Sequence, residues 1–267
     1  MLLVTYLSPS VPMGLYLAIA DHLAARLGIA VTLRSWSSRS GPAPGGPDPF
    51  ARAEADIGFL CAPSLLWLEE QGSAELLEVA PVHSDPRNGG RPVYFAELVV
   101  ASDAPPQRLE DLRGARFAYN DDVSLSGYFS VLERLAEAGE EASFFGTYVH
   151  AGSHLASLEQ VAAGLVEVAA IDSHVLELVR ERDPKIDARV RVIETLGPFA
   201  VQPVVARVGL DPSLRASVAA ALSDMHEMHA PRSLLKHHRI ERFAPVERAA
   251  YRRERDRLCA SGAWLLR

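Results

Sequence analysis

The stretch from residue 114 to residue 128 reads Gly-Ala-Arg-Phe-Ala-Tyr-Asn-Asp-Asp-Val-Ser-Leu-Ser-Gly-Tyr. Its apolar part, residues 116–119, predicts a short strand that runs into a polar turn. The turn opens an amphipathic helix, because Phe129, Leu132 and Leu135 fall on one helical face. A strand, a polar turn and a helix in this order are typical of an α/β fold.

Two serines and a glycine, Ser124, Ser126 and Gly127, lie where this helix begins. Serine at a helix start commonly caps the backbone N–H groups of the first turn. The same N–H groups and hydroxyls could instead face a bound anion, helped by the helix dipole and by the close approach that Gly127 allows. The residues alone favour the cap and leave the anion site as the second interpretation.

Length and composition restrict the class of protein. The 267 residues suffice for one large domain or two small ones, and 48% of them are hydrophobic. A formal net charge of -7 argues against bulk nucleic-acid binding, which usually needs a basic surface. The two cysteines, Cys61 and Cys259, are far apart and predict neither a disulfide framework nor a metal site. No apolar run reaches the roughly 18 residues of a membrane helix, so we expect no membrane-embedded segment.

The chain begins Met-Leu-Leu-Val-Thr-Tyr, which predicts a strand rather than a secretion signal. Two locations follow as expectations. The protein is periplasmic or otherwise extracytoplasmic if a leader was removed, and cytoplasmic if the chain is complete as written.

Strand and helix patterns alternate along the chain, which predicts largely parallel sheets. The predicted strands are 2–6, 29–33, 56–60, 76–82, 95–101, 116–119, 144–149, 168–171, 189–193 and 201–207. The predicted helices are 15–27, 63–70, 126–138, 154–163 and 173–182, and everything from Pro212 onward is predicted to be helical. A Pro/Gly-rich loop, which we expect to be mobile, spans residues 37–49.

This order of elements predicts two lobes joined by two crossovers. Lobe 1 is discontinuous and comprises residues 1–98 and 200–267, and lobe 2 comprises residues 99–199. Such α/β designs form a hinged cleft, and their ligands bind at the carboxyl ends of the strands that face it.

Seven segments recur in a characteristic order and spacing: 56–60 (Asp-Ile-Gly-Phe-Leu), 94–100 (Tyr-Phe-Ala-Glu-Leu-Val-Val), 109–118 (Leu-Glu-Asp-Leu-Arg-Gly-Ala-Arg-Phe-Ala), 124–128 (Ser-Leu-Ser-Gly-Tyr), 152–154 (Gly-Ser-His), 168–173 (Val-Ala-Ala-Ile-Asp-Ser) and 192–198 (Val-Ile-Glu-Thr-Leu-Gly-Pro). Together they resemble the substrate-binding proteins of phosphate, phosphite and phosphonate ABC transporters, a branch of the type II periplasmic binding-protein fold. The resemblance runs from about residue 56 to residue 205.

The resemblance implies a function: capture of a small anion, a phosphonate, phosphate or phosphate ester, in the cleft between the lobes. It implies that the turn at Ser124, Ser126 and Gly127 grips the oxyanion and that His154 reaches the same anion. It also implies that Asp172 points into the cleft. An ABC permease is the implied partner, with no cofactor, and the oligomeric state is not predicted.

On the first lobe the resemblance implies an aromatic wall, for which Tyr94 is the candidate, and a counterpart of the serine turn at Cys61. The chain departs from the family pattern in three ways. The secretion signal is missing, Cys61-Ala-Pro stands where a Gly-Pro turn is common, and the serine turn carries the bulky Leu125 and Tyr128.

Each of the other candidate residues has two interpretations. Tyr94 is core packing or cleft wall, Tyr128 lines the pocket or packs inside its lobe, and Cys61 is more typical of a small buried residue than of a nucleophile. Asp172 is an N-cap, or it accepts a hydrogen bond from a protonated oxyanion or an amino group. His154 points to solvent, or as an imidazolium it favours an anion, so that binding weakens as the pH rises past its pKa.

The histidines near the C-terminus favour no metal site. His226 and His229 are three residues apart and share a helix face, but the mixed residues around them are typical of a helix surface.

Two rival functions stay open at the level of sequence. A cytoplasmic enzyme with lyase or transferase chemistry on the same fold would use His154, Asp172 and Cys61 as candidate groups. A ligand sensor would act through a partner protein.

Overall fold

The computed structural model describes residues 1–36 and 39–260, which divide into two compact units. Unit 1 contains Met1–Val93 and Ala200–Arg255, and unit 2 contains Tyr94–Phe199 and the last helix from Asp256 onward. We predicted the first boundary five residues later, between residues 98 and 99. The boundary lies earlier because the strand that begins at Val93 pairs with a strand of unit 2 from Ala96 to Val100.

Unit 1 has its elements in two stretches of the chain. The first stretch holds β1 (Leu2–Thr5), α1 (Met13–Leu27), β2 (Thr32–Ser35), β3 (Ile57–Phe59), α2 (Ala62–Gln71), β4 (Ala74–Leu76), β5 (Val79–His83) and the short helix η1 (Pro86–Asn88). The second holds β11 (Val204–Arg207), α7 (Pro212–Ser223), η5 (Asp224–His226), α8 (His229–His237), β12 (Ile240–Pro245) and the start of α9 (Arg248–Ala260).

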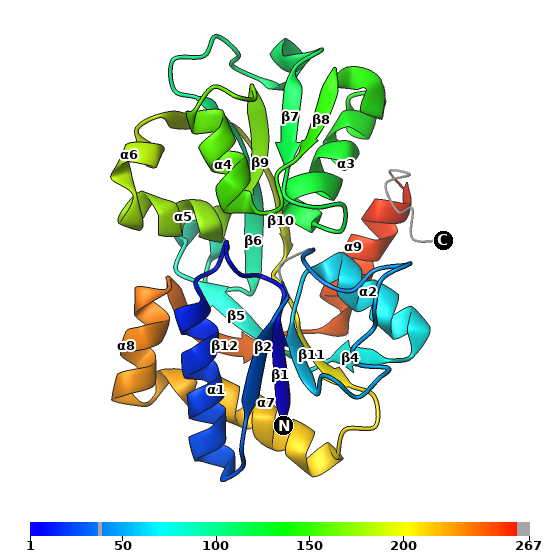
Figure 1. The fold of residues 1–267 in the computed structure, drawn as a ribbon, viewed down its shortest axis with the longest axis vertical. Helices are drawn as coiled ribbons and strands as arrows, with labels where there is room; N and C mark the ends of the chain where they lie inside the picture. The colour runs from blue at the N-terminus through cyan, green and yellow to red at the C-terminus, as the bar shows by residue number, and fades with distance from the viewer. Residues whose placement is uncertain (37–38, 261–267) are drawn as a thin grey trace. The chain divides into compact units, whose positions relative to one another are not determined.

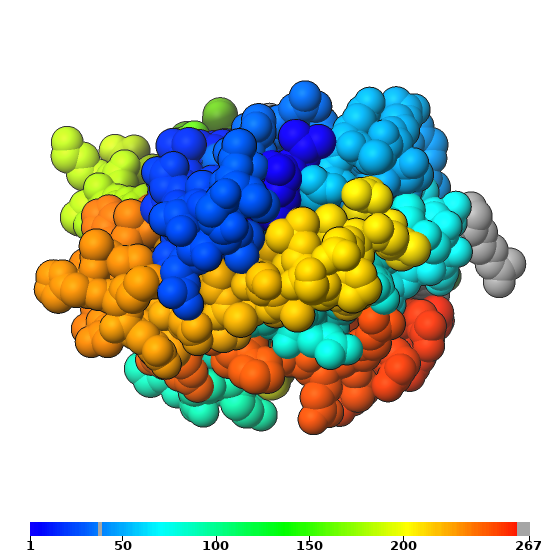
Figure 2. Space-filling model, turned by 90° about the horizontal axis from the view of Figure 1, so that it is seen from below, coloured from blue at the N-terminus to red at the C-terminus, as the bar shows by residue number. Residues whose placement is uncertain are grey.

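The main sheet of unit 1 has the strand order β2-β1-β3-β11-β4. Strand β1 pairs in parallel with β2 and β3, whereas β11 pairs antiparallel with β3 and β4. The sheet is therefore mixed rather than largely parallel, because the returning chain enters it in the opposite direction. Helices α1, α7 and α8 lie side by side on the face of unit 1 seen in Figure 2, and the His22 imidazole on α1 bonds the Ala221 carbonyl on α7 at 2.8 Å.

The prediction that the chain is helical from Pro212 onward is wrong at β12. This strand pairs antiparallel with β5, with Phe243 opposite Pro81. The alternation of buried Ile240 and Phe243 with charged Glu241 and Arg242 is too short and irregular to predict a strand. Pairing with β5 decides the conformation, because it buries the apolar side chains that the strand carries.

We predicted that the Pro/Gly-rich loop at residues 37–49 is mobile, but from residue 39 onward it packs against unit 1. Residues 37 and 38 lie outside the described residues. Residues 40–43 are buried. The Ser40 carbonyl accepts the Cys61 N–H at 2.8 Å. The end of the loop inserts the ring of Phe50, which is 1% exposed, against Gly58 of β3.

Unit 2 has a simple α/β order. It holds β6 (Val93–Ala101), η2 (Leu109–Leu112), β7 (Arg116–Tyr119), η3 (Leu125–Phe129), α3 (Ser130–Glu137), η4 (Ala142–Phe144), β8 (Thr147–His150), α4 (His154–Ala162), β9 (Val168–Asp172), α5 (Ser173–Arg182), α6 (Pro184–Asp187) and β10 (Val190–Ala200).

The sheet of unit 2 has the order β10-β6-β9-β7-β8, in which β7 pairs in parallel with both β8 and β9. The chain moves from β7 to β8 in one direction and back past β7 to β9 in the other. Right-handed crossovers then require α3 and α4 on opposite sides of the sheet, and Figure 1 shows them on either side of β7, β8 and β9. The predicted strand at 116–119 and the predicted helix at 173–182 are confirmed as β7 and α5.

Hydropathy along the helices adds one fact about membranes. Among residues 1–36 and 39–260, no helix combines the length and the apolar character that crossing a bilayer requires.

The contact between Gly58 and Phe50 generates a prediction about stability. A Cβ at position 58 would lie 2.6 Å from Phe50 Cζ and 3.2 Å from Val205 Cγ2. We expect Gly58→Ala to lower the free energy of unfolding by about 1–3 kcal/mol through overpacking, as measured by urea unfolding. Because leucine is shorter than phenylalanine, Gly58→Ala combined with Phe50→Leu should cost less than the sum of the two single changes. Additive costs would contradict this account of the packing.

Candidate functional site

Buried polar side chains gather where the parallel strands of unit 2 end. Because β7 and β9 are parallel neighbours, their carboxyl ends lie at the same edge of the sheet. The segments that follow these strands, and the start of α4, carry polar residues that are each at most 7% exposed: Asn120, Asp121, Ser124, Ser126, His154 and Asp172. Buried polar groups need partners, so this edge is held by hydrogen bonds.

The turn after β7 is organised by Asp121. One oxygen of its carboxylate accepts the Val123 N–H at 2.9 Å, and the other accepts the Asn120 side-chain amide at 2.7 Å. These two hydrogen bonds hold the backbone of the turn just before Ser124.

Ser124 caps the helix that follows, as the sequence favours. Its hydroxyl accepts the Gly127 N–H at 3.1 Å. The first turn, η3, is a π-helix in which the Phe129 N–H reaches back to the Ser124 carbonyl at 3.1 Å. The Ser130 hydroxyl donates to the Ser126 carbonyl at 2.8 Å. The predicted helix at 126–138 is therefore a π-helical turn followed by α3, and π-helical turns are frequent at functional sites.

Gly127 is required by close packing. A Cβ there would lie 1.7 Å from Asn120 Oδ1 and 2.9 Å from His154 Cε1. No side chain fits, so the glycine lets the Asn120 amide and the His154 ring approach the backbone of the turn.

Ser126 and His154 meet directly. The Ser126 hydroxyl lies 3.3 Å from His154 Nε2, and this pair forms a hydrogen bond in either tautomer of the ring. Ser153 caps α4 by accepting the Ala156 N–H at 3.1 Å, which holds His154 at the first position of the helix. The serine turn and the Gly-Ser-His segment that the sequence analysis singled out are thus joined in space.

His154 is neutral at ordinary pH. Burial lowers its pKa to about 4, and a hydrogen bond to the backbone of Ala170 opposes this only in part. The interpretation of His154 as an imidazolium is therefore wrong for the protein without ligand, in which the ring is neutral. A charged ring is costly where water is excluded.

Asp172 is the last residue of β9 and caps α5. Its Oδ1 accepts the His174 N–H at 2.8 Å and the Val175 N–H at 3.4 Å. The N-cap that the sequence offered as one interpretation is confirmed, and contact of the carboxylate with a ligand stays a prediction.

Tyr128 packs inside unit 2. Its ring centroid lies 5.0 Å from that of Tyr119 and 6.3 Å from that of Tyr148. Burial raises the pKa of Tyr128, with the nearby Tyr119 and Asp122 adding to the effect, so the phenol stays neutral. A role in lining a ligand pocket stays a prediction.

Tyr94 and Cys61 are the remaining candidates from the sequence. Tyr94 is 1% exposed, and its ring packs 6.1 Å from the ring of Phe199; the structure groups it with unit 2, whereas we expected it on the first lobe. Cys61 belongs to unit 1, is 3% exposed and precedes α2. Ligand contacts of both residues stay predictions.

Three residues at this edge are not among the ligand-binding residues predicted from the sequence: Asn120, Asp121 and Ser130. The run Asn-Asp-Asp directly after a predicted strand is the signal that could have identified the first two, since polar residues at a strand's carboxyl end face the site in α/β folds. Ser130 has no such signal, because its role depends on the π-helical turn.

The segments that frame this edge contain no lysine or arginine: residues 117–130, 148–158 and 168–179. Donors here are hydroxyls, backbone amides and a neutral imidazole. No three histidine, cysteine or carboxylate side chains converge in a way that could hold a metal, within residues 1–36 and 39–260.

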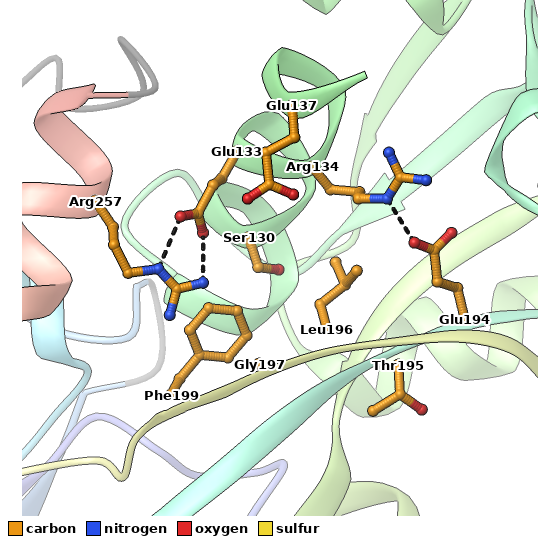
Figure 3. A pocket seen from close by; sticks show the side chains of 10 residues that line it. All are labelled: Ser130, Glu133, Arg134, Glu137, Glu194, Thr195, Leu196, Gly197, Phe199 and Arg257. Atoms are coloured by element: carbon orange, nitrogen blue, oxygen red, sulfur yellow. Dashed lines mark hydrogen bonds and ion pairs between the residues drawn. The ribbon is translucent and has the colours of Figure 1, made fainter.

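A hollow of about 270 Å³ in unit 2 is lined by Ser130 together with charged residues of α3, β10 and α9. Its two arginines are engaged by carboxylates, as Figure 3 shows: Arg257 bonds Glu133 at 2.8 Å and Arg134 bonds Glu194 at 2.5 Å. Glu137 adds a further negative charge to its wall. The hollow therefore suits an anion less well than the serine turn does.

Comparison with known families gives a match over most of the chain. The family model described as "ABC transporter, phosphonate, periplasmic substrate-binding protein" matches residues 1–251.

Solved structures share the fold at low sequence identity. A binding protein component of a phosphonate ABC transporter from Pseudomonas aeruginosa is 15% identical, with a TM-score of 0.82 over 98% of this chain and 85% of that one. PhnD1 from Prochlorococcus marinus, solved with methylphosphonate, is 15% identical, with a TM-score of 0.80 over 98% and 97% of the two chains. A Xanthomonas citri protein solved with ATP is 19% identical, with a TM-score of 0.73 over 98% and 96%. These neighbours show the two-lobed type II periplasmic binding-protein fold that the sequence predicted.

Burial of His154 predicts how folding stability depends on pH. The unfolded chain takes up the imidazole proton near pH 6.5, whereas the folded chain does so only near pH 4. Between these values the unfolded state binds more protons, so the free energy of unfolding falls as the pH falls, by roughly 3 kcal/mol in total. Urea unfolding across this window should show the fall in the wild type and a flatter profile in His154→Asn. Equal slopes in the two proteins would contradict the buried neutral ring.

Ser130 supplies a second prediction about this turn. Ser130→Ala removes the donor to the Ser126 carbonyl, so we expect a loss of about 1 kcal/mol in urea unfolding and faster amide exchange over residues 126–130. The matched control is Ser157→Ala on α4, a fully buried serine whose hydroxyl has no hydrogen-bond partner among the described residues. The control should cost little, and an equal loss in both variants would argue against a special role of Ser130.

Proposed function

Since the chain belongs to the family of periplasmic substrate-binding proteins of phosphonate ABC transporters, we propose that its ligand is a small phosphorus oxyanion held by Ser124, Ser126, Gly127 and His154 of unit 2. A phosphonate is the leading ligand, with phosphate and phosphate esters as the other members of the class. The observation that carries the proposal is the hydrogen bond between the buried Ser126 hydroxyl and His154 Nε2 at the start of two helices.

The chemistry of the turn suits a tetrahedral oxyanion. The N-termini of η3 and α4 contribute their dipoles and backbone N–H groups, which favour negative charge. Three to four charge-assisted hydrogen bonds, at roughly 1.5–3 kcal/mol each, are enough for micromolar binding. An anion beside His154 also favours the imidazolium, so binding raises the pKa of this ring from its low value.

Membership of the family implies an ABC permease as partner. The family acts outside the cytoplasm, and we propose the same location for this protein, with its ligand delivered to the permease. Fractionation of cells that express the native gene tests this location. We expect the protein in the periplasmic fraction, and its presence in the cytoplasmic fraction alone would contradict the proposed location.

Capture is favoured over catalysis at this site. Asp172 is engaged in capping α5, and the Cys61 side chain is buried in unit 1. The transport family supports binding, and no turnover is needed to explain the serine turn. Phosphate esters are part of the same test, since the Xanthomonas citri neighbour was solved with ATP.

A thermal-shift screen tests the ligand class. Phosphate, phosphite, methylphosphonate, ATP, sulfate and acetate are compared, and a ligand at a hundredfold excess over its Kd adds about 2.7 kcal/mol of stability. We expect a shift with a phosphorus oxyanion and none with acetate. A shift with acetate alone would contradict the proposal, and so would the absence of a shift with every phosphorus compound in the screen.

Two variants test the residues. We expect Ser126→Ala and His154→Ala each to weaken binding of the ligand found in the screen roughly tenfold or more, as measured by calorimetry, because each removes a hydrogen bond to the anion. Ser233→Ala on the exposed face of α8 makes the same chemical change in unit 1 and should leave the affinity unchanged. Circular dichroism confirms that each variant is folded. Unchanged affinity in both site variants would exclude this turn as the binding site.

A further inference from the structure

The side-chain amide of Asn120 is held in one orientation beside the serine turn. Its side chain is 3% exposed. Its Nδ2 donates to Asp121 Oδ2 at 2.7 Å. A carboxylate oxygen only accepts, so the atom that faces Asp121 has to be the nitrogen, and the amide cannot be flipped.

The carbonyl oxygen of Asn120 therefore points the other way, toward the serine turn. Oδ1 lies 1.7 Å from the point where a Gly127 Cβ would be, and His154 Cε1 lies 2.9 Å from the same point. The hydrogen-bond acceptor of the amide thus lies against the glycine of the turn and near the ring that bonds Ser126.

The titratable side chains at this edge of the sheet are carboxylates and histidines. They come from each element packed at the edge: Asp121 and Asp122 in the turn, His150 at the end of β8, His154 on α4, Asp172 at the end of β9 and His174 on α5. Two of the carboxylates, Asp121 and Asp172, are buried. The framing segments 117–130, 148–158 and 168–179 hold no lysine or arginine. An imidazolium at His154 can balance one negative charge of a bound oxyanion, whereas a second negative charge would find no lysine or arginine in these segments and two buried carboxylates at the same edge.

We infer that Asn120 is a specificity-determining residue, which selects oxyanions that keep one proton by accepting a hydrogen bond from that P–OH group at Oδ1. The inference rests on the proposed function and refines its ligand: a singly charged phosphonate, phosphate or phosphite fits, whereas sulfate, phosphinates and phosphodiesters carry no such proton. The proton stays on the ligand oxygen, and no bond is made or broken other than this hydrogen bond.

A pair of ligands of equal charge tests this directly on the wild type. Methylphosphonate as the monoanion carries an OH group where dimethylphosphinate carries a methyl group of similar size. We expect dimethylphosphinate to bind roughly tenfold or more weakly in calorimetry, since it lacks the donor. Equal affinity of the two ligands would overturn the inference and leave the proposed function standing, whereas failure of both, and of phosphate, phosphite and phosphate esters, would overturn the proposed function itself.

The protonation state of the bound ligand is a second readout that needs no variant. Phosphorus-31 NMR distinguishes the monoanion of methylphosphonate from its dianion by chemical shift. From one unit below to two units above the second pKa of the ligand in solution, the bound signal should keep the shift of the monoanion. A bound signal with the shift of the dianion would overturn the inference, because Asn120 would then face an oxygen without a proton.

A variant assigns the effect to Asn120. Asn120→Leu removes the acceptor at similar volume and should abolish the preference for methylphosphonate over dimethylphosphinate. Retention of the preference in Asn120→Leu would overturn the role of this residue, and the wild-type measurements decide the inference if the variant fails to fold.

Discussion

The hydrogen bond between the Ser126 hydroxyl and the His154 imidazole joins two helix starts that are 28 residues apart in the chain. It forms because β7 and β9 are parallel neighbours and because the chain passes through β8 and α4 between them. The rest of the edge adapts to this contact. Gly127 leaves room for the ring, Ser124 and Ser130 hold the turn in its π-helical form, and Asp121 fixes the amide of Asn120.

In the site that we propose, the groups that face the anion are neutral before it binds. Burial keeps His154 uncharged, and the framing segments contribute no lysine or arginine. Backbone N–H groups, hydroxyls and helix dipoles then supply what favours an anion. The same surroundings disfavour a second negative charge, which connects the geometry of the turn to the singly charged form of the ligand that we propose it selects.

The sequence predicted the class of fold, the serine turn and its cap, and the alternation of elements in unit 2, because local patterns decide them: β7 and α5 lie where periodicity and caps placed them. Partners distant in the chain decided the rest. Strand β12 depends on pairing with β5, and the loop at residues 40–43 is buried because α2 and β3 lie beneath it. The charge state of His154 depends on burial that no spacing reveals, and the importance of Asn120 depends on which way a side-chain amide faces.

A crystal structure of the protein with methylphosphonate tests the central claim most directly. The account predicts phosphonate oxygens within hydrogen-bond distance of Ser126 Oγ and His154 Nε2, with Asn120 Oδ1 facing one of them. A phosphonate bound elsewhere, with the serine turn unchanged from its present contacts, would contradict it.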